Sequence, residues 1–549
     1  MRKRILLFLF VFIPGLIYAQ LFNRSEEFTR QDTLRGAITP ERAWWDVTFY
    51  HLSVEVNLED STFSGSNRIQ YRVLESASVM QIDLQEPMVI ERVTQAGKEL
   101  RFEREGNAFF IQLNQEQQTD RIQELDVFFS GKPKKAVRAP WDGGVTWTRD
   151  QNGKPFIATA NQGIGASIWW PNKDHGYDEP DSMAISITVP DSLMDISNGR
   201  LLSVEDHDNG TRTWHWYVTN PINNYGVNIN IGDYEHFGEI IEGEKGELTM
   251  DYYVIRGNKE RAISHFSDAP RTIKALEYWF GPYPFYEDGF KLVQVPYLGM
   301  EHQSSVTYGN QFKMGYLGRD LSMSGWGLKF DFIIIHETGH EWFANSLTSK
   351  DVADLWVHEG FTSYSEGLFV EFFYGKEAGA EYVRGVRLNI SNREPLIGIY
   401  DVHYEGSSDM YNKGSNLLHT IRTLIGNDDT WRQILRGLST EFYHQTVTTR
   451  QVEEYISEKA GLDLSKVFDQ YLRDPRVPIL EYAIQQNQLL YRWANTIPGF
   501  DMNVRIRLNE KEQWLEPQTS WQAIKLSSSD VDLTVDPDFY VGTMNVTGN

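Results

Sequence analysis

The stretch HETGHEWFANSLTSKDVADLWVHEGF, residues 336–361, decides the fold of the region around it. It begins with the pattern His-Glu-x-x-His, in which His336 and His340 are four residues apart, and it carries Glu359 with eighteen residues between it and the second histidine. Residues four apart lie on one face of a helix, so both imidazoles can reach a single ion. Apolar residues on both sides of the pattern predict that this helix is buried nearly all round.

Glu359 is expected on a second helix that packs against the first. Asp351 or Asp354 can cap the start of this helix, and an aromatic-rich segment follows. For the five-residue pattern alone, a chance match is the alternative, with histidines satisfied by hydrogen bonds. The glutamate at this spacing argues against chance, because two histidines and one glutamate leave the fourth zinc position open, as a catalytic site needs. The sequence therefore predicts one zinc ion held by His336, His340 and Glu359, although residue types alone do not separate zinc from cobalt or manganese.

Glu337 has the position of a general base. It is turned about 100° from His336 around the helix, so it can face the same cleft without being a ligand. A zinc ion would lower the pKa of its water to about 7 and polarise a carbonyl group. Glu337 could take the proton and later pass it to a leaving amine. We therefore expect hydrolysis of peptide bonds.

The composition is that of a globular protein with more than one core. The chain has 549 residues, of which 41% are hydrophobic and 13% aromatic, and this length predicts about two to four domains. The absence of cysteine excludes disulfides, a thiolate metal site and a cysteine nucleophile. The formal net charge of -24 would repel a phosphate backbone, so we expect no nucleic-acid partner. The same charge favours substrates that carry a positive end.

The first twenty residues, MRKRILLFLFVFIPGLIYAQ, have the layout of a secretory signal peptide. Three basic residues precede a mostly apolar run, and the segment ends at the small residue Ala19. The run is shorter than the roughly 20 residues of a spanning helix, although a membrane anchor is the alternative interpretation. We therefore expect residues 1–19 to be removed and the mature protein to be exported, periplasmic or extracellular, without a membrane span.

Hydrophobic periodicity divides the rest of the chain into three parts. Residues 20–236 alternate with the period of strands, for example at Leu52 and Val54, and predict a large antiparallel β domain. Residues 237–474 change to a helical period after a short β-rich passage. The period of two returns over residues 475–549, which are enough for a small β-sandwich. The predicted fold is therefore multidomain α+β with a mainly helical catalytic domain in the middle.

Two segments of the middle part show helical signals most clearly. In one, apolar residues follow the i, i+3, i+4, i+7 spacing of a helix with one buried face: Trp431, Ile434, Leu435 and Leu438. In the other, Thr448 and Gln451 have the spacing of a capping box, and Gly461 provides a natural stop.

Four stretches occur in an order that resembles the zinc aminopeptidases related to aminopeptidase N and leukotriene hydrolase. HETGHEW with LWVHEGF is similar to the zinc motif of that family. PYLGMEHQSS, residues 296–305, resembles its Gly-Ala-Met-Glu-Asn exopeptidase motif, and MYNKGS, residues 410–415, resembles the segment that carries its transition-state tyrosine. TANQGIGASIWWPNKDHGYDEPD, residues 159–181, resembles the strand and loop before its Pro-x-x-Asp-x-Pro stretch. The resemblance covers most of the mature chain and implies a thermolysin-like catalytic domain.

The resemblance also implies roles for single residues. Glu301 would bind the free amino terminus of a peptide, and the backbone of Gly299 and Met300 would line the cleft. Tyr411 would stabilise the transition state, and Gln162 would be a second contact to the amino terminus. On sequence alone, each of these side chains would be assigned to packing or to a solvated surface. The shared order of the motifs is what makes them functional candidates.

The chain departs from the family pattern at several positions. His302 stands where the family usually has Asn, and Leu298 stands where it usually has the first Gly, so the amino-terminal pocket can differ in shape. Thr338 and Gly339 replace the usual apolar pair inside the zinc motif. Glycine destabilises the interior of a helix by about 1 kcal/mol relative to alanine. A glycine at position 339 therefore predicts that another backbone approaches the helix closely at this point. We expect no long helical C-terminal domain, and therefore a more open cleft or one closed by a partner subunit.

The function that these residues favour is that of an exported zinc aminopeptidase acting on peptides with a free amino terminus. A zinc endopeptidase or dipeptidyl-type peptidase is the first alternative, and Glu301 argues against it because an acidic group can capture an amino terminus. A non-catalytic peptide-binding relative is the second alternative. Such a protein would usually lack the base or the tyrosine, and both Glu337 and Tyr411 are present. The preferred first residue, the physiological substrate and the oligomeric state do not follow from the sequence.

Overall fold

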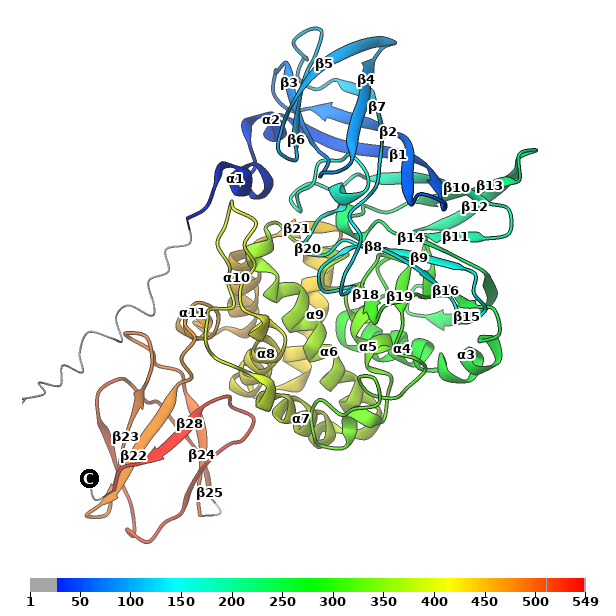
Figure 1. Cartoon of the computed structure of the whole chain (residues 1–549). Helices are drawn as coiled ribbons and strands as arrows, with labels where there is room; N and C mark the ends of the chain where they lie inside the picture. Colours follow the sequence, from blue (N-terminus) through cyan, green and yellow to red (C-terminus); the bar gives the residue numbers. More distant parts are fainter. Residues whose placement is uncertain (1–26, 510, 548–549) are drawn as a thin grey trace, which may run out of the picture.

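The computed structural model of the protein describes residues 27–509 and 511–547, and the predicted signal peptide lies outside them. Figure 1 shows a β-rich N-terminal part, a central helical part and a small β-rich C-terminal part. This arrangement confirms the predicted multidomain α+β fold. None of the helices in the described ranges has the length and hydropathy that a bilayer crossing requires.

A large sheet makes up most of the N-terminal part, after the short helices α1 (Arg30–Gly36) and α2 (Pro40–Ala43). Its strands are β1 (Trp45–Asn57), β2 (Thr62–Val73), β3 (Val79–Asp83), β4 (Val89–Gln95), β5 (Lys98–Glu105), β6 (Ala108–Gln112), β7 (Ile122–Gly131), β10 (Ser182–Pro190), β12 (Arg200–Asp206) and β13 (Thr211–Val218). They follow the order β12-β13-β10-β1-β2-β7-β4-β5-β6-β3. As the alternation predicts, Leu52 and Val54 are buried, whereas Glu55 is exposed.

One pair of this sheet departs from the predicted antiparallel arrangement. β1 and β10 run parallel, with Leu52 opposite Ile185 and Val54 opposite Ile187, while their other neighbours run antiparallel. Parallel neighbours need a long connection, and here residues 58–181 intervene before the chain returns beside β1. The alternation of apolar residues is the same for both directions, so the sequence pattern does not distinguish them.

A second sheet joins the large sheet to the central part. It contains β8 (Gly144–Arg149), β9 (Pro155–Ala160), β11 (Met194–Ser197) and β14 (Ile229–Gly232), in the order β11-β14-β9-β8. Ile157 of β9 packs in the core of the large sheet. Ala158 and Ala160 pack instead against Val295 and Met300 of the central part. The loop after β9, which carries Gln162, therefore leaves the sheet on the side of the helical region.

The central part combines a mixed sheet with a set of helices. The sheet has the order β15-β16-β17-β19-β18, with β15 (Tyr234–Gly243), β16 (Gly246–Ile255), β17 (Phe290–Gln294), β18 (Gly299–Met300) and β19 (Val306–Tyr308). The predicted domain boundary at residue 236 thus falls inside β15. The helices are α3 (Lys259–His265), α4 (Asp268–Phe280), α5 (Phe332–Gly339), α6 (Trp356–Tyr374), α7 (Lys376–Gly385), α8 (Asn412–Ile425), α9 (Asp428–Glu441), α10 (Thr449–Ala460) and α11 (Ser465–Leu472). A short ladder pairs β20 (Leu347–Ser349) with β21 (Gln445–Val447).

The helical signals of the sequence are confirmed in this part. The four apolar residues predicted for one face of α9 are all buried. The capping box of Thr448 and Gln451 opens α10, and Gly461 ends it in a left-handed conformation. The buried helices α5 and α6 lie against each other and against α4, which brings the histidine motif and Glu359 together.

The C-terminal part consists of two small sheets. One contains β22 (Ile479–Gln485), β23 (Gln488–Ala494), β26 (Gln522–Lys525) and β28 (Gly542–Asn545), and the other contains β24 (Val504–Leu508), β25 (Lys511–Leu515) and β27 (Leu533–Val535). Leu480, Trp493 and Ile506 on their apolar faces are buried. Arg384 of α7 pairs with Asp538 at 2.6 Å, so this part docks onto the helices behind the site.

Candidate metal centre

Helix α5 positions the two histidines. Its first turn is capped by Asp331, whose Oδ1 accepts hydrogen bonds from the backbone N–H groups of Ile333 at 3.0 Å and Ile334 at 3.3 Å. The helix ends at Gly339, one residue earlier than the prediction that both histidines lie within it. His340 is the C-cap and keeps a right-handed helical conformation, with φ -64° and ψ -18°. The two imidazoles therefore still project from the same face.

Gly339 allows α6 to approach α5 closely, but the neighbours are not those expected. A Cβ at this position would lie 2.8 Å from Oγ of Ser365 and 3.1 Å from Cγ2 of Thr362. Both are side chains of α6, so the predicted approach of another backbone is wrong. A side chain at residue 339 would require Ser365 and Thr362 of α6 to shift.

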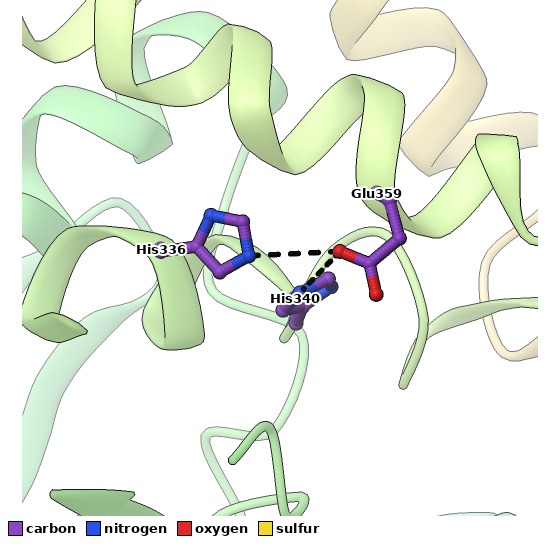
Figure 2. Close-up of side chains that lie close together, drawn as sticks. All are labelled: His336, His340 and Glu359. Carbon is purple, nitrogen blue, oxygen red and sulfur yellow. Dashed lines mark ion pairs between the residues drawn. The ribbon is translucent and has the colours of Figure 1, made fainter. Parts of the chain in front are cut away.

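The three predicted metal ligands converge, as Figure 2 shows. Nε2 of His336 lies 3.5 Å from Oε2 of Glu359, and Nε2 of His340 lies 3.4 Å from the same oxygen. All three residues are buried. Donor atoms about 2.1 Å from a tetrahedral zinc ion lie about 3.4 Å from one another. The spacing of the donors and their chemical type therefore fit one such ion.

The state of Glu359 gives a second reason to place a cation here. Its Oε2 is buried and makes no hydrogen bond to any residue that the structure describes; its charge is balanced by the two imidazoles, whose Nε2 atoms lie 3.5 and 3.4 Å away. Burial raises the pKa of this carboxyl group, but His340 and His336 hold it well below the usual value. Glu359 is therefore ionised, with an oxygen free to bind a metal.

The outer nitrogen of each histidine is fixed by a further contact. Nδ1 of His340 lies 3.1 Å from the carbonyl oxygen of Phe343; a carbonyl can only accept, so this nitrogen carries a proton and Nε2 is the nitrogen that faces the metal site. Nδ1 of His336 lies 2.8 Å from Oε1 of Glu366. Oε2 of Glu366 in turn accepts a hydrogen bond of 2.6 Å from the hydroxyl of Tyr382. Such contacts orient metal ligands.

Sequence reasoning missed Glu366. The available signal was its spacing, since it follows Glu359 by seven residues, or about two turns of α6, and so lies on the same face. The contacts of Glu359 and Glu366 raise the pKa of His336 well above its usual value, although burial opposes the rise. A divalent cation binds neutral imidazole, so metal and proton compete for this ring.

Glu337 lines the same cleft as the histidines and is buried. Burial raises its pKa to about 8, while the neighbouring histidines act in the opposite direction. A cation held by the three ligands would lower this pKa again. At neutral pH the carboxylate is then able to accept a proton, which is the state a general base needs.

The strand β18 runs along the edge of the cleft beside α5. A Cβ at Gly299 would lie 2.6 Å from Cγ2 of Ile333 and 2.9 Å from Oε1 of Glu337. Without a side chain at residue 299 the strand lies directly on these side chains of α5, and the backbone of Gly299 and Met300 lines the cleft, as predicted. Leu298, the first departure from the family motif, also lines the cleft.

Glu301 follows β18 and points to the metal group. Its ligand oxygen lies within 4.8 Å of those of Glu337 and His340. The residue is buried, and its Oε1 accepts no hydrogen bond from the described part of the chain. His302, the second departure from the motif, is turned away from the cleft, with Nδ1 3.3 Å from Oγ1 of Thr307. Burial lowers the pKa of His302 to about 3, so it is a neutral core residue and adds no charge to the site.

Gln162 reaches the site from the N-terminal part. Its Nε2 donates a hydrogen bond of 2.9 Å to Oε1 of Glu359, across 197 residues of sequence. This amide therefore contacts one oxygen of the metal ligand, while the other oxygen faces the histidines. The structure thus places Gln162, which was a candidate only through the family resemblance, in direct contact with a predicted metal ligand.

Tyr411 lies beside the histidine pair, close to Glu359 of α6. It precedes α8, and its ring stacks on that of His336 with centroids 6.0 Å apart and an interplanar angle of 18°. Burial, together with the carboxylates of Glu359 and Glu301, raises its pKa well above the usual value. The hydroxyl therefore stays protonated and can donate a hydrogen bond into the cleft.

The predicted residues line one cleft of about 590 Å³ between the N-terminal and central parts. Its wall includes residues that sequence reasoning did not single out, among them an exposed tryptophan, aromatic side chains of the central part and a further carboxylate: Trp141, Tyr316, Phe332 and Glu405. None of these belongs to a motif, so no signal in the sequence identified them. The cleft is mainly apolar, with the acidic groups gathered beside the histidines.

Comparison with known proteins matches both parts that form this cleft. The Peptidase M1 N-terminal domain model covers residues 47–225, and the Peptidase family M1 domain model covers residues 266–471. The chain is 22% identical to Probable aminopeptidase 1 of Sulfurisphaera tokodaii over 418 residues, which are 72% of this chain and 49% of that protein. It is 24% identical to Puromycin-sensitive aminopeptidase of Caenorhabditis elegans over 474 residues, 80% of this chain and 48% of that protein. The chain thus spans about half the length of these curated relatives.

Solved structures share the fold. The crystal structure of an M1 zinc metallopeptidase from Deinococcus radiodurans superposes with a TM-score of 0.65 at 19% identity, covering 79% of this chain and 94% of that one. One family model contains Gln162, and the other contains the histidine motif, Glu301, Glu359 and Tyr411. Both family models match, and the chain belongs to peptidase family M1.

Proposed function

We propose that the protein is an exported zinc aminopeptidase that removes amino-terminal residues from peptides. The observation that carries this proposal is the position of Glu301 and Gln162 beside the metal ligands, at one end of the cleft. A protein that cuts at the amino terminus must recognise a positive ammonium group close to the scissile bond. A buried carboxylate without a hydrogen bond on Oε1 and an amide oxygen are suitable acceptors for such a group.

The metal of this site is proposed to be zinc, held by His336, His340 and Glu359. When bound, zinc supplies a Lewis acid that polarises the peptide carbonyl and makes water acidic near neutral pH. Glu337 accepts the proton of the attacking water and then transfers it to the departing amine. Tyr411 donates a hydrogen bond to the oxygen on which negative charge develops. The relatives named as aminopeptidases support this assignment.

Recognition of the amino terminus depends on charge. The α-amino group of a peptide is positive below its pKa of about 8, and the protein as a whole is strongly acidic, with a formal net charge of -24. Glu301 supplies a carboxyl group whose pKa is raised by burial in the free protein and would be lowered again by a bound ammonium group, while the carbonyl oxygen of Gln162 supplies a neutral acceptor. A blocked amino terminus would leave Glu301 buried without a partner, which disfavours its binding.

Export is proposed from residues 1–20 alone. Their basic start, apolar run and small residue at position 19 are the pattern of a cleaved signal peptide. Expression of the full chain followed by amino-terminal sequencing of the exported product tests this. The mature protein should begin at Gln20; a cell-retained protein that begins at Met1 would overturn the export proposal and leave the enzymatic one standing.

The test of the activity is a panel of amino-acid anilides and of matched free and acetylated peptides, assayed with and without a chelator. The protein should cleave anilides and free peptides, ignore acetylated ones, and lose activity when the metal is removed. Metal analysis should give about one zinc per chain. Equal cleavage of free and acetylated peptides would instead identify an endopeptidase with the same metal site.

A further inference from the structure

The loop that carries Gln162 forms a tight turn closed by a backbone hydrogen bond. Residues 161–165 form a turn in which the backbone N–H of Gly165 donates 2.7 Å to the carbonyl of Asn161. Gly163 and Gly165 have φ angles of 71° and 89°, which favour glycine. A Cβ at Gly165 would lie 2.3 Å from Oδ2 of Asp174. The turn itself is therefore set by its own sequence, while its orientation toward Glu359 depends on contacts from outside.

Two side chains from distant parts of the chain hold this turn by its carbonyl groups. Nε2 of His403 lies 2.7 Å from the carbonyl oxygen of Gly163. Arg35, in the last turn of α1, donates to the carbonyl oxygen of Ile164 and, at 3.4 Å, to that of Gly163. These are the carbonyls that directly follow Gln162. We call Arg35 and His403 the loop clamp.

The clamp is itself fixed in place. Nη1 of Arg35 lies 3.7 Å from Oδ2 of Asp174, and the same oxygen accepts a 3.3 Å hydrogen bond from the backbone of Ser167, just beyond the turn. A Cβ at Gly36 would lie 2.0 Å from the backbone nitrogen of His403. Only glycine lets the end of α1 lie directly on the segment that carries His403. Both halves of the clamp are thus built against each other as well as against the turn.

Both side chains of the clamp can donate hydrogen bonds to the turn near neutral pH. The Arg35 guanidinium offers N–H donors and no acceptor, and its side chain is only 22% exposed. Burial lowers the pKa of His403 to about 4, so its ring is neutral near pH 7. A carbonyl oxygen can only accept, which puts the remaining proton of His403 on Nε2. Both donors are then available over the whole neutral range.

We propose that Arg35 and His403 are positioning residues for Gln162. By holding the two carbonyls after Gln162, they keep its carboxamide within 2.9 Å of Glu359, where it would meet the amino terminus of a peptide. The inference rests on the proposed function, because it assigns the clamp to amino-terminus recognition. The helix α1 thereby becomes part of the substrate-binding apparatus although Arg35 itself does not line the cleft.

The test compares Arg35→Met with Gln162→Ala and with their combination in the full chain. Arg35→Met keeps an unbranched side chain, two atoms shorter than that of arginine, and removes its hydrogen-bond donors. Loss of such donors to a binding group should raise KM for free peptides about 5- to 10-fold, with kcat and zinc content near those of the parent. Arg35→Lys should restore part of the effect. Arg30→Met is the matched control, since Arg30 lies on the same helix, is 67% exposed and pairs with Glu105 on the surface.

The double variant, Arg35→Met with Gln162→Ala, shows whether Arg35 acts through Gln162. If it does, Arg35→Met should add little to KM once Gln162 is already alanine. Full additivity of the two changes, or an equal effect from Arg30→Met, would show that α1 contributes only general stability and would overturn the inference. An unchanged KM in Arg35→Met would overturn it as well.

A variant at the other half of the clamp covers the case in which Arg35→Met does not fold. His403→Ala removes the donor to Gly163, and His403→Gln offers a replacement donor. KM should rise in the first and recover in the second, with an unchanged melting temperature in both; the same rise in both variants would contradict the inference. The parent's preference for free over acetylated peptides is measured separately, so failure of the aminopeptidase proposal cannot be mistaken for failure of the clamp.

Discussion

The cleft contains two groups of residues that are built in different ways: the metal ligands, called here the metal end, and directly beside them Gln162 and Glu301, called the recognition end. The metal end is supplied by α5, its C-cap and α6, all within residues 332–374, and each ligand is oriented by a neighbouring helix or carbonyl group. The recognition end is assembled from a loop of the N-terminal part and the residue after a two-residue strand, Gln162 and Glu301. Changes at the metal end should therefore affect whether the reaction occurs, and changes at the recognition end should affect which peptides react.

The largest effects are expected at the metal end, where two variants separate binding from chemistry. His340→Ala removes a ligand and should lose both zinc and activity. Glu337→Ala leaves the ligand set intact, so it should keep about one zinc per chain while kcat falls by about 100- to 10,000-fold. Metal analysis beside turnover measurements checks both. If Glu337→Ala also lost its zinc, the assignment of Glu337 as a base outside the ligand set would be wrong.

Tyr411→Phe tests the third group at the metal end. It removes one hydroxyl and keeps the ring that stacks on His336. Since the hydrogen bond forms with charge that develops only in the transition state, kcat should fall by about 100-fold with little change in KM. Tyr316→Phe, at another tyrosine of the cleft wall, should behave like the parent. A fully active Tyr411→Phe enzyme would assign the tyrosine to packing.

At the recognition end, Glu301→Ala should change selectivity. A charge-assisted hydrogen bond contributes roughly 1.5 to 3 kcal/mol, so kcat/KM for free peptides should fall about 10- to 150-fold. Acetylated peptides should be affected much less, and the preference between the two should shrink. Glu405→Ala, at an exposed carboxylate of the same cleft, should leave the preference largely intact. Equal losses for free and acetylated peptides in Glu301→Ala would place Glu301 in catalysis, not in recognition.

The smallest effect is expected behind the metal end, at Glu366. Glu366→Ala removes the partner of Nδ1 of His336, and loss of such an outer contact weakens metal binding by about 10- to 100-fold. Titration with a competing chelator should show this, while activity at saturating zinc should stay close to that of the parent. Glu377→Ala, at an exposed glutamate of α7, is the control. Unchanged zinc affinity in Glu366→Ala would mean that packing alone orients His336.

The sequence by itself determined the parts of the protein that depend on short-range geometry. The spacing of His336 and His340 fixes two imidazoles on one helical face, because each helical residue turns by about 100° and rises 1.5 Å. The capping box of α10 and the buried face of α9 follow from the same local rules. The alternation of apolar residues likewise identified the strands and their buried faces, since successive side chains of a strand point in opposite directions.

Tertiary structure alone decided the contacts between distant segments. Local periodicity carries no information about which segments become neighbours, so it could not predict the parallel pairing of β1 and β10, the hydrogen bond from Gln162 to Glu359 or the clamp of Arg35. The side chains around Gly339 were mispredicted for the same reason. The glycine in the sequence indicates that another group approaches the helix closely, but only the packing of α6 on α5 determines that this group is a pair of side chains.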